Sequence, residues 1–93
     1  MNEDKLKQLL DSLQINREGK LSGDKYIIQL NNSDDYSKMY TKLDKCEEAT
    51  LDPEGMIMSN SESLMTYLTD DFDITLKADF DKDNYFLIIE EAQ

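Results

Sequence analysis

The C-terminal part of the sequence contains a run in which apolar and polar residues alternate. A period of two, kept over the nine residues 72–80, predicts a β-strand with one buried side and one polar side. The turn-forming residues 81–84 come next, and the largely apolar segment 85–90 predicts a second, more deeply buried strand. The sequence therefore predicts a C-terminal β-hairpin, which needs other elements to cover its apolar side. The alternating apolar residues are Phe72, Ile74, Leu76, Ala78 and Phe80.

The N-terminal segment predicts an amphipathic helix over residues 3–15. Four leucines follow the spacing i, i+3, i+4, i+7, which places them on one stripe of the helix. Asn2 is the expected N-cap, and Asn16 and Gly19 are the expected exit, because both residue types tolerate the left-handed conformation that follows many helices. We interpret the stripe as part of the core; a groove for a partner is the alternative. The leucines are Leu6, Leu9, Leu10 and Leu13.

A second helix is predicted after Asn31 and Asn32, with Ser33 as its N-cap. Asp34 and Asp35 lie in its first turn and three lysines lie further along, an order that suits the helix dipole. Its apolar residues again follow helical spacing, which predicts that one stripe packs on a sheet. These residues are Tyr36, Met39, Tyr40 and Leu43.

Shorter segments complete the expected elements. Residues 25–30 predict a strand, and residues 20–30 together can form a hairpin whose first arm is brief. Residues 52–55, with the sequence Asp-Pro-Glu-Gly, predict a turn, and residues 56–58 predict a short strand after it. Residues 62–68 fit a short helix, with a strand as the alternative.

These elements predict one α+β domain over residues 1–93 with a mostly antiparallel four-stranded sheet. Two helices, or three if residues 62–68 are helical, would pack on one face of this sheet. A chain of this length buries enough surface for one modest core. No apolar run approaches the roughly 18 residues of a membrane span and no signal-peptide pattern is present, so we expect a soluble, cytoplasmic protein. Cys46 is the only cysteine, so no internal disulfide is expected.

The net charge of −11 is unevenly distributed along the chain. Residues 1–46 contain eight acidic and eight basic residues, which cancel. Residues 47–93 contain thirteen acids, and their only bases are Lys77 and Lys82, so the whole net charge lies there. Such a field repels nucleic acid and attracts basic surfaces. We therefore expect a basic nucleic-acid-binding protein as the partner, and neither nucleic acid nor a membrane as a direct ligand.

The sequence lacks the usual residues and motifs of catalysis. It contains no histidine, no P-loop and no nucleophile-elbow motif, so neither an enzyme nor a bound cofactor is expected. Four carboxylates at relative positions 1, 3, 5 and 12 match the calcium loop of an EF-hand. That loop needs a helix on each side, whereas strands are predicted here. We therefore interpret residues 79–84 as an acidic hairpin tip and expect no metal site. The four residues are Asp79, Asp81, Asp83 and Glu90.

Eight acidic residues of the C-terminal half form the candidate partner-binding surface. Alternate residues of a strand lie about 6.6–6.8 Å apart on one side, so Asp71, Asp73, Asp79 and Asp81 would form a spaced row. Each strand of duplex DNA carries one charge per about 3.4 Å, so such a row can compete with DNA for lysines and arginines. The alternatives are a solvated acidic face and an interaction module that uses an apolar helix face. The eight residues are Asp70, Asp71, Asp73, Asp79, Asp81, Asp83, Glu90 and Glu91.

The chain contains the short stretches Met1-Asn2, the short helix that follows, Lys20 to Gly23, Ile27-Ile28, Asn31-Asn32 and Ile74 to Lys77. These stretches are similar to parts of small acidic anti-CRISPR proteins encoded by phages. Those proteins are α/β inhibitors of the nuclease Cas9. The resemblance implies a phage or mobile-element protein that occupies the protospacer-adjacent-motif reading site of the nuclease with carboxylates, as a DNA mimic and without catalysis.

Overall fold

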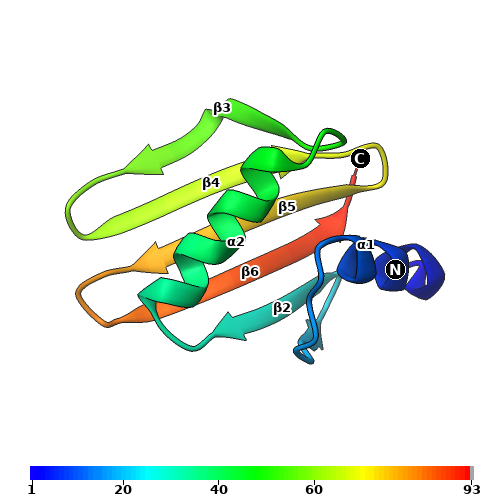
Figure 1. The fold of residues 1–93 in the computed structure, drawn as a ribbon, viewed down its shortest axis with the longest axis horizontal. Helices are drawn as coiled ribbons and strands as arrows, with labels where there is room; N and C mark the ends of the chain where they lie inside the picture. Colours follow the sequence, from blue (N-terminus) through cyan, green and yellow to red (C-terminus); the bar gives the residue numbers. More distant parts are fainter. Residues whose placement is uncertain (93) are drawn as a thin grey trace.

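The computed structural model describes residues 1–92, which form an α+β fold with one six-stranded antiparallel sheet (Figure 1). The strand order across the sheet is β1-β2-β6-β5-β4-β3. The predicted class is confirmed, whereas the predicted count of four strands is wrong. In chain order the elements are α1 (Glu3–Ser12), β1 (Lys20–Ser22), β2 (Lys25–Leu30), α2 (Ser33–Lys45), β3 (Thr50–Met58), β4 (Glu62–Leu68), β5 (Phe72–Asp79) and β6 (Asn84–Glu91).

The predicted C-terminal hairpin is confirmed as β5 and β6, which are the two central strands of the sheet. The alternating residues of β5 are buried on one side, and Ile74 lies opposite Ile89 in the register. Phe80 is the exception, because β5 ends before it and its side chain is 42% exposed. Its ring packs edge-on against Tyr36, with the ring centroids 6.2 Å apart.

The additional strands come from segments whose local sequence favoured other structures. Residues 62–68 are strand β4 and not a helix, because each of its residues pairs with β5. Residues 52–55 are not a turn between two elements but a bulge within β3. There the register passes from Asp52 opposite Thr66 to Ile57 opposite Leu64. A proline is tolerated at such a place, because β3 is an edge strand and a bulge already interrupts its ladder.

Helix α1 ends earlier than predicted, and a different residue provides its exit. Asn2 is the N-cap as expected, since its Oδ1 accepts a hydrogen bond from the backbone N–H of Lys5. At the other end Gln14 adopts φ 56°. Its N–H donates to the carbonyl of Asp11, and the next N–H donates to the carbonyl of Leu10, the two bonds of a Schellman motif. The expectation that Asn16 and Gly19 form this exit is wrong.

The N-cap of helix α2 lies one residue earlier than predicted. The side chain of Asn32, and not that of Ser33, accepts a hydrogen bond from the N–H of Asp35 at 2.9 Å. The acidic first turn and the basic last turn lie as the sequence indicated. The helix contacts β2, β5 and β6, and it crosses the sheet diagonally in front of β6, β5 and β4 (Figure 1).

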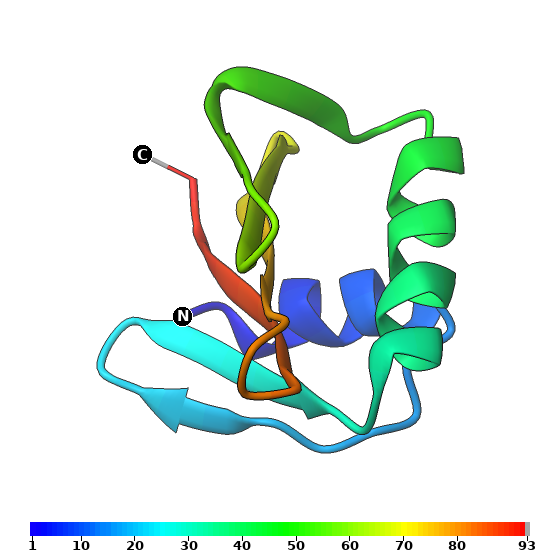
Figure 2. The same ribbon diagram turned by 90° about the vertical axis from the view of Figure 1, so that its left-hand side faces the viewer.

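Both helices lie on the same side of the sheet, and the other side carries no helix (Figure 2). Leu6 of α1 and Leu13, the C-cap of that helix, join Met39 and Leu43 of α2 in one cluster with the inward residues of β2, β4, β5 and β6. The interpretation of the leucine stripe as core is therefore confirmed. No helix in the described part of the chain is both long enough and apolar enough to cross a membrane.

Candidate partner-binding surface

The eight predicted acidic residues lie at two opposite ends of β5 and β6. The terminal cluster, beside the chain termini, consists of Asp70, Asp71, Asp73, Glu90 and Glu91; the hairpin cluster, at the β5–β6 turn, consists of Asp79, Asp81 and Asp83. Asp73 and Asp79 are six residues apart on one strand, which corresponds to about 20 Å. The structure therefore brings the acids into two groups and does not form one continuous row.

The terminal cluster contains two carboxylates side by side on the uncovered side of the sheet. Asp73 lies directly opposite Glu90 in the β5–β6 register, where Cβ atoms are about 4.5–5.5 Å apart. Like charges in such a pair destabilise a sheet. Lys25 lies opposite Glu90 on the other side, but no ion pair joins these two side chains within the described residues. The register therefore places two like charges side by side, and a bound cation would reduce their repulsion.

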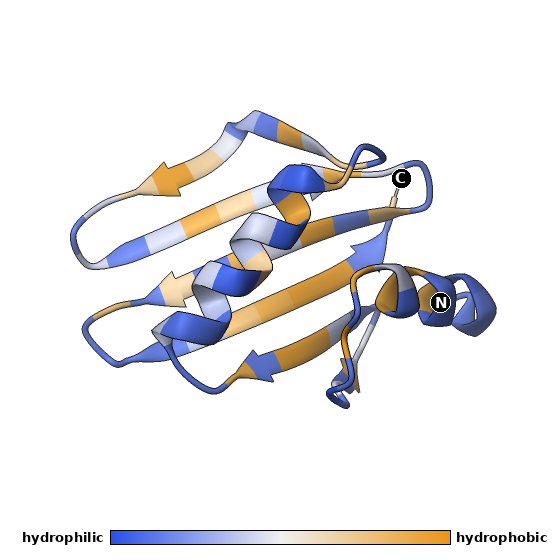
Figure 3. Cartoon of the chain, in the orientation of Figure 1, coloured by the Kyte–Doolittle hydropathy of each residue, from blue (hydrophilic) through white to orange (hydrophobic). Residues whose placement is uncertain are grey.

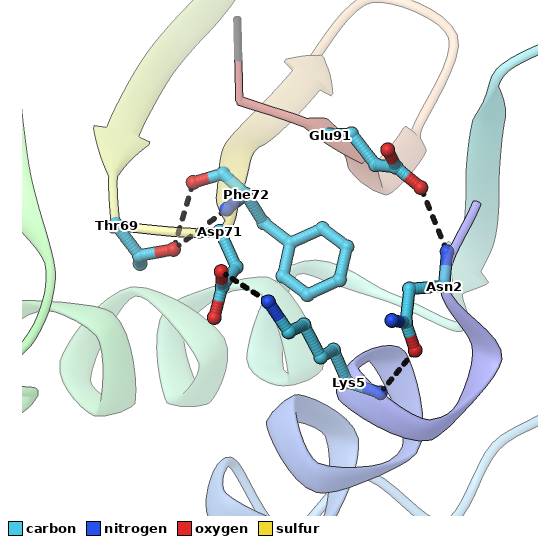
Figure 4. A network of polar contacts seen from close by, with 6 residues as sticks. All are labelled: Asn2, Lys5, Thr69, Asp71, Phe72 and Glu91. Atoms are coloured by element: carbon cyan, nitrogen blue, oxygen red, sulfur yellow. Dashed lines mark hydrogen bonds and ion pairs between the residues drawn. The ribbon is translucent and has the colours of Figure 1, made fainter.

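The other acids of this cluster tie helix α1 to the end of the sheet (Figure 4). The Nζ of Lys5 lies 3.0 Å from Oδ1 of Asp71, and Oε1 of Glu91 accepts a hydrogen bond from the N–H of Asn2 at 2.7 Å. Thr69 closes the adjacent turn, because its Oγ1 accepts from the N–H of Phe72 at 2.9 Å. Since the side chains of Lys5 and Asp71 are half exposed, their pair contributes little stability.

The hairpin cluster is shaped by the turn between β5 and β6. Oδ1 of Asp79 accepts a hydrogen bond from the N–H of Lys82 at 3.2 Å, and Asp83 adopts φ 54°. The nearby Asp83 carboxylate, together with burial, raises the pKa of the Tyr85 phenol. Glu62 of β4 lies directly opposite Asp79 and adds a carboxylate that the sequence did not assign, because the segment was interpreted as a helix.

The calcium spacing in the sequence does not correspond to a metal site in the structure. Glu90, the twelfth residue of the pattern, lies at the far end of β6 from the hairpin turn. Six residues of strand separate it from Asn84, which corresponds to about 20 Å. Among residues 1–92 no three His, Cys, Asp or Glu side chains are placed to hold a metal ion.

Between the two clusters the uncovered side of the sheet carries apolar side chains on β2, β6, β4 and β3, with polar side chains among them; this surface was not among the sequence predictions. Register places these side chains outward: Ile27 lies opposite Ile88, and Leu64 lies opposite Ile57. β6 is the most continuously apolar strand, with polar residues at its two ends (Figure 3). The signal was present in the sequence as apolar residues on both sides of two strands. We call this side the open face; its large apolar residues are Ile27, Ile57, Leu64, Leu68, Phe86 and Ile88.

The acids of residues 47–93 greatly outnumber the bases there, and most of them form no ion pair among the described residues. Of the thirteen acids in residues 47–93, ion pairs hold only Asp71 and Glu91 within the described chain, so eleven have no such partner. In the N-terminal half Arg17 contacts Asp35 at 2.8 Å, and its hydrogen bond lowers the pKa of that carboxyl. The unbalanced negative charge is thus concentrated on strands β3 to β6 and on the turns between them.

Comparison of the chain with protein-family models, with curated proteins and with solved structures finds no match. The chemistry of the surface follows from its own groups. Its carboxylates can accept hydrogen bonds and ion pairs from lysine and arginine side chains of a partner. The open face between them can bury apolar side chains. The fold and surface together define a small α+β protein whose uncovered sheet side is acidic and partly apolar.

Proposed function

We propose that the protein is a non-catalytic inhibitor that binds a basic nucleic-acid-binding protein and competes with nucleic acid for it. The observation that carries this proposal is the set of eleven carboxylates without an ion-pair partner in residues 47–93. Carboxylates held on a rigid sheet attract lysine and arginine side chains and raise the rate of association with a basic surface. The two clusters, about 20 Å apart, span the length of about six phosphates of one DNA strand.

The similarity of short stretches to phage anti-CRISPR proteins suggests the class of partner. On that basis the protein comes from a phage or mobile element, acts in the cytoplasm and inhibits a Cas9-type nuclease. Such a nuclease reads its short DNA motif with arginine side chains, which carboxylates can engage in place of guanine bases.

The test separates the position of the charges from the net charge. One variant reverses three acids of the two clusters, Asp70→Lys, Asp81→Lys and Glu90→Lys, which make no recorded side-chain hydrogen bond or ion pair. A control variant reverses three exposed acids of the N-terminal half and carries the same net charge. The control substitutions are Glu18→Lys, Asp24→Lys and Asp44→Lys.

Binding is measured by competition between each variant and motif-containing DNA for the guide-loaded nuclease, at low and high salt. The cluster variant is expected to lose roughly a hundredfold or more in affinity, and the control much less. Affinity of the unmodified protein should fall as salt rises, because the interaction is between solvent-exposed charges. Equal losses of affinity in the cluster variant and the control variant would contradict the proposal. Binding that neither salt nor competing DNA weakens would also contradict it. If the nuclease does not bind, the same variants applied to proteins captured from a bacterial lysate test the wider class.

A further inference from the structure

We infer that the open face of the sheet is the docking surface and that its occupant is an amphipathic helix of the partner, basic at both ends and apolar between them. This inference rests on the proposed function, because it supplies the surface through which a basic partner binds. It is carried by three observations: the apolar character of the open face, the position of the acids around it, and the single lysine at its centre.

The open face is more apolar than a solvent-facing side of a sheet needs to be. When helices cover one side of an antiparallel sheet, the outward positions are normally polar. Here the central strand β6 points Phe86 and Ile88 outward, half-buried only by their neighbours. At the adjoining edge Leu68 is 40% exposed and Ile57 is 51% exposed. The outward apolar residues form two areas, one on β2 and β6 and one on β3 and β4, with Thr75 and Lys77 of β5 between them. Exposed apolar areas with polar groups around them are typical of interaction sites.

Acidic pairs stand at both ends of the open face. Asp73 faces Glu90 at one end, and Glu62 faces Asp79 at the other, each pair on adjacent strands of the open face. The pairs are about 20 Å apart along the strands, which is the rise of about 13 residues of α-helix. A helix lying along β5, the strand that both pairs share, can therefore place basic residues over both pairs and lay apolar side chains on Phe86 of one neighbouring strand and Leu64 of the other.

The charges also argue against a second copy of this chain as the occupant. Two open faces packed together would bring acidic pairs near acidic pairs, in molecules that each carry a net charge of −11. Lys77 further restricts the charge pattern that a partner helix can have. It lies in the centre of the open face, with Phe86 on one side and Leu64 on the other. Its ammonium repels a ligand that is basic along its whole length, whereas its aliphatic stem extends the apolar area.

The test uses the full chain and two synthetic helical peptides of equal composition. One peptide carries leucines at i, i+3, i+4 and i+7 between arginine-bearing ends; the other has the same residues in scrambled order. Binding and its location are measured from backbone amide shifts in NMR titrations. The amphipathic peptide should shift the central amides of β2, β4, β5 and β6 and bind roughly tenfold more tightly than the scrambled peptide.

A pair of matched variants distinguishes apolar docking from attraction between charges. Leu68→Glu places an extra acid on the open face, and Leu21→Glu makes the same change at a residue that is 63% exposed and lies opposite Tyr26, on the helix side. Docking on the open face predicts that Leu68→Glu weakens binding of the amphipathic peptide roughly tenfold, although it adds attraction for a cation. Leu21→Glu should leave the affinity unchanged. If Leu68→Glu does not fold, Ile57→Glu provides the same comparison.

Two results would overturn the inference, and they affect the proposed function differently. If both peptides bind equally and shift only the turns that hold the acids, the docking surface is wrong and the proposed function stands. If neither peptide binds at low salt, both are wrong, because even the charge attraction is then missing.

Discussion

Replacement of Gln14 by glycine should stabilise the protein, although it removes a side chain. Gln14 occupies the left-handed position of the Schellman motif that ends α1, with φ 56°. For an L-residue this conformation costs roughly 1–2 kcal/mol, whereas glycine adopts it without a steric penalty. Glycine in turn makes the unfolded chain more flexible, at a cost of roughly 0.5–1 kcal/mol. The net expectation is an increase of about 0.5–1 kcal/mol in the free energy of unfolding.

The assay is urea denaturation followed by circular dichroism, with thermal melting as a second measure. For a domain of this size 1 kcal/mol corresponds to about 4–8 °C, so the melting temperature of Gln14→Gly should rise by roughly 2–8 °C. The dependence on urea should keep its slope, because the fold buries the same surface. The backbone carbonyl of Gln14, which accepts a hydrogen bond from Lys42 at 3.4 Å, is unchanged by the substitution.

The control places the same substitution inside the helix. Gln8 is exposed in the middle of α1, so Gln8→Gly should destabilise the protein by about 1 kcal/mol. An increase in the free energy of unfolding for Gln14→Gly and a decrease for Gln8→Gly would support the assigned end of α1. If Gln14→Gly destabilises the protein as much as Gln8→Gly does, residue 14 is helical and the reasoning fails.

Further substitutions test the interior and the N-terminal ion pair. Tyr67 is 2% exposed and its hydroxyl has no hydrogen-bond partner among the described residues, so Tyr67→Phe should stabilise the protein by about 1 kcal/mol in urea. Burial also raises the pKa of Tyr67, so the folded protein holds the phenol proton more tightly than the unfolded chain does. The free energy of unfolding should therefore fall as the pH rises above about 10. Ultraviolet titration should show Tyr67 ionising at a higher pH than an exposed tyrosine. Arg17 lowers the pKa of Asp35 from 3.8, so this pair stabilises the fold above that pH and the benefit is lost as the pH falls below it. Asp35→Asn should therefore flatten the acid side of the stability curve, and an unchanged curve would show that the pair does not matter. Gly19→Ala should destabilise by about 2 kcal/mol, because a Cβ would lie 2.7 Å from a backbone carbonyl of β2, whereas Gly55→Ala, with its nearest contact at 3.4 Å, should be tolerated.

The strands that the sequence predicted correctly are those whose pattern is set by their own residues. In β5 four inward apolar residues alternate with polar ones, and no other structure buries them on one side. β4 lacks this clarity, because Ser61 resembles a helix cap and Leu64, Met65 and Leu68 also fit one helical face. Its strand conformation depends on hydrogen bonds to β3 and β5, which no local pattern contains. The same reason explains the missed bulge in β3.

The candidate site was predictable in its composition but not in its arrangement. The outward positions of Asp73 and Asp79 follow from the alternation in β5. The pairing of Asp73 with Glu90 depends on the exact register of the β5–β6 hairpin, and the pairing of Asp79 with Glu62 depends on β4, a segment that also fitted a helix. The open face likewise exists only because Ile27 and Ile88, far apart along the chain, lie opposite each other.

The position of β6 has a consequence for how the molecule folds during synthesis. This strand lies between β2 and β5, so the N-terminal hairpin of β1 and β2 joins the rest of the sheet only through it. β2 and both helices are synthesised early, whereas β6, the strand that pairs with β2, is synthesised after the other five strands of this sheet. Until β6 is present, the sheet on which the apolar sides of α1 and α2 pack is incomplete. We expect folding to be slow and governed by this late long-range pairing, with the earlier segments open to proteases and chaperones in the interval.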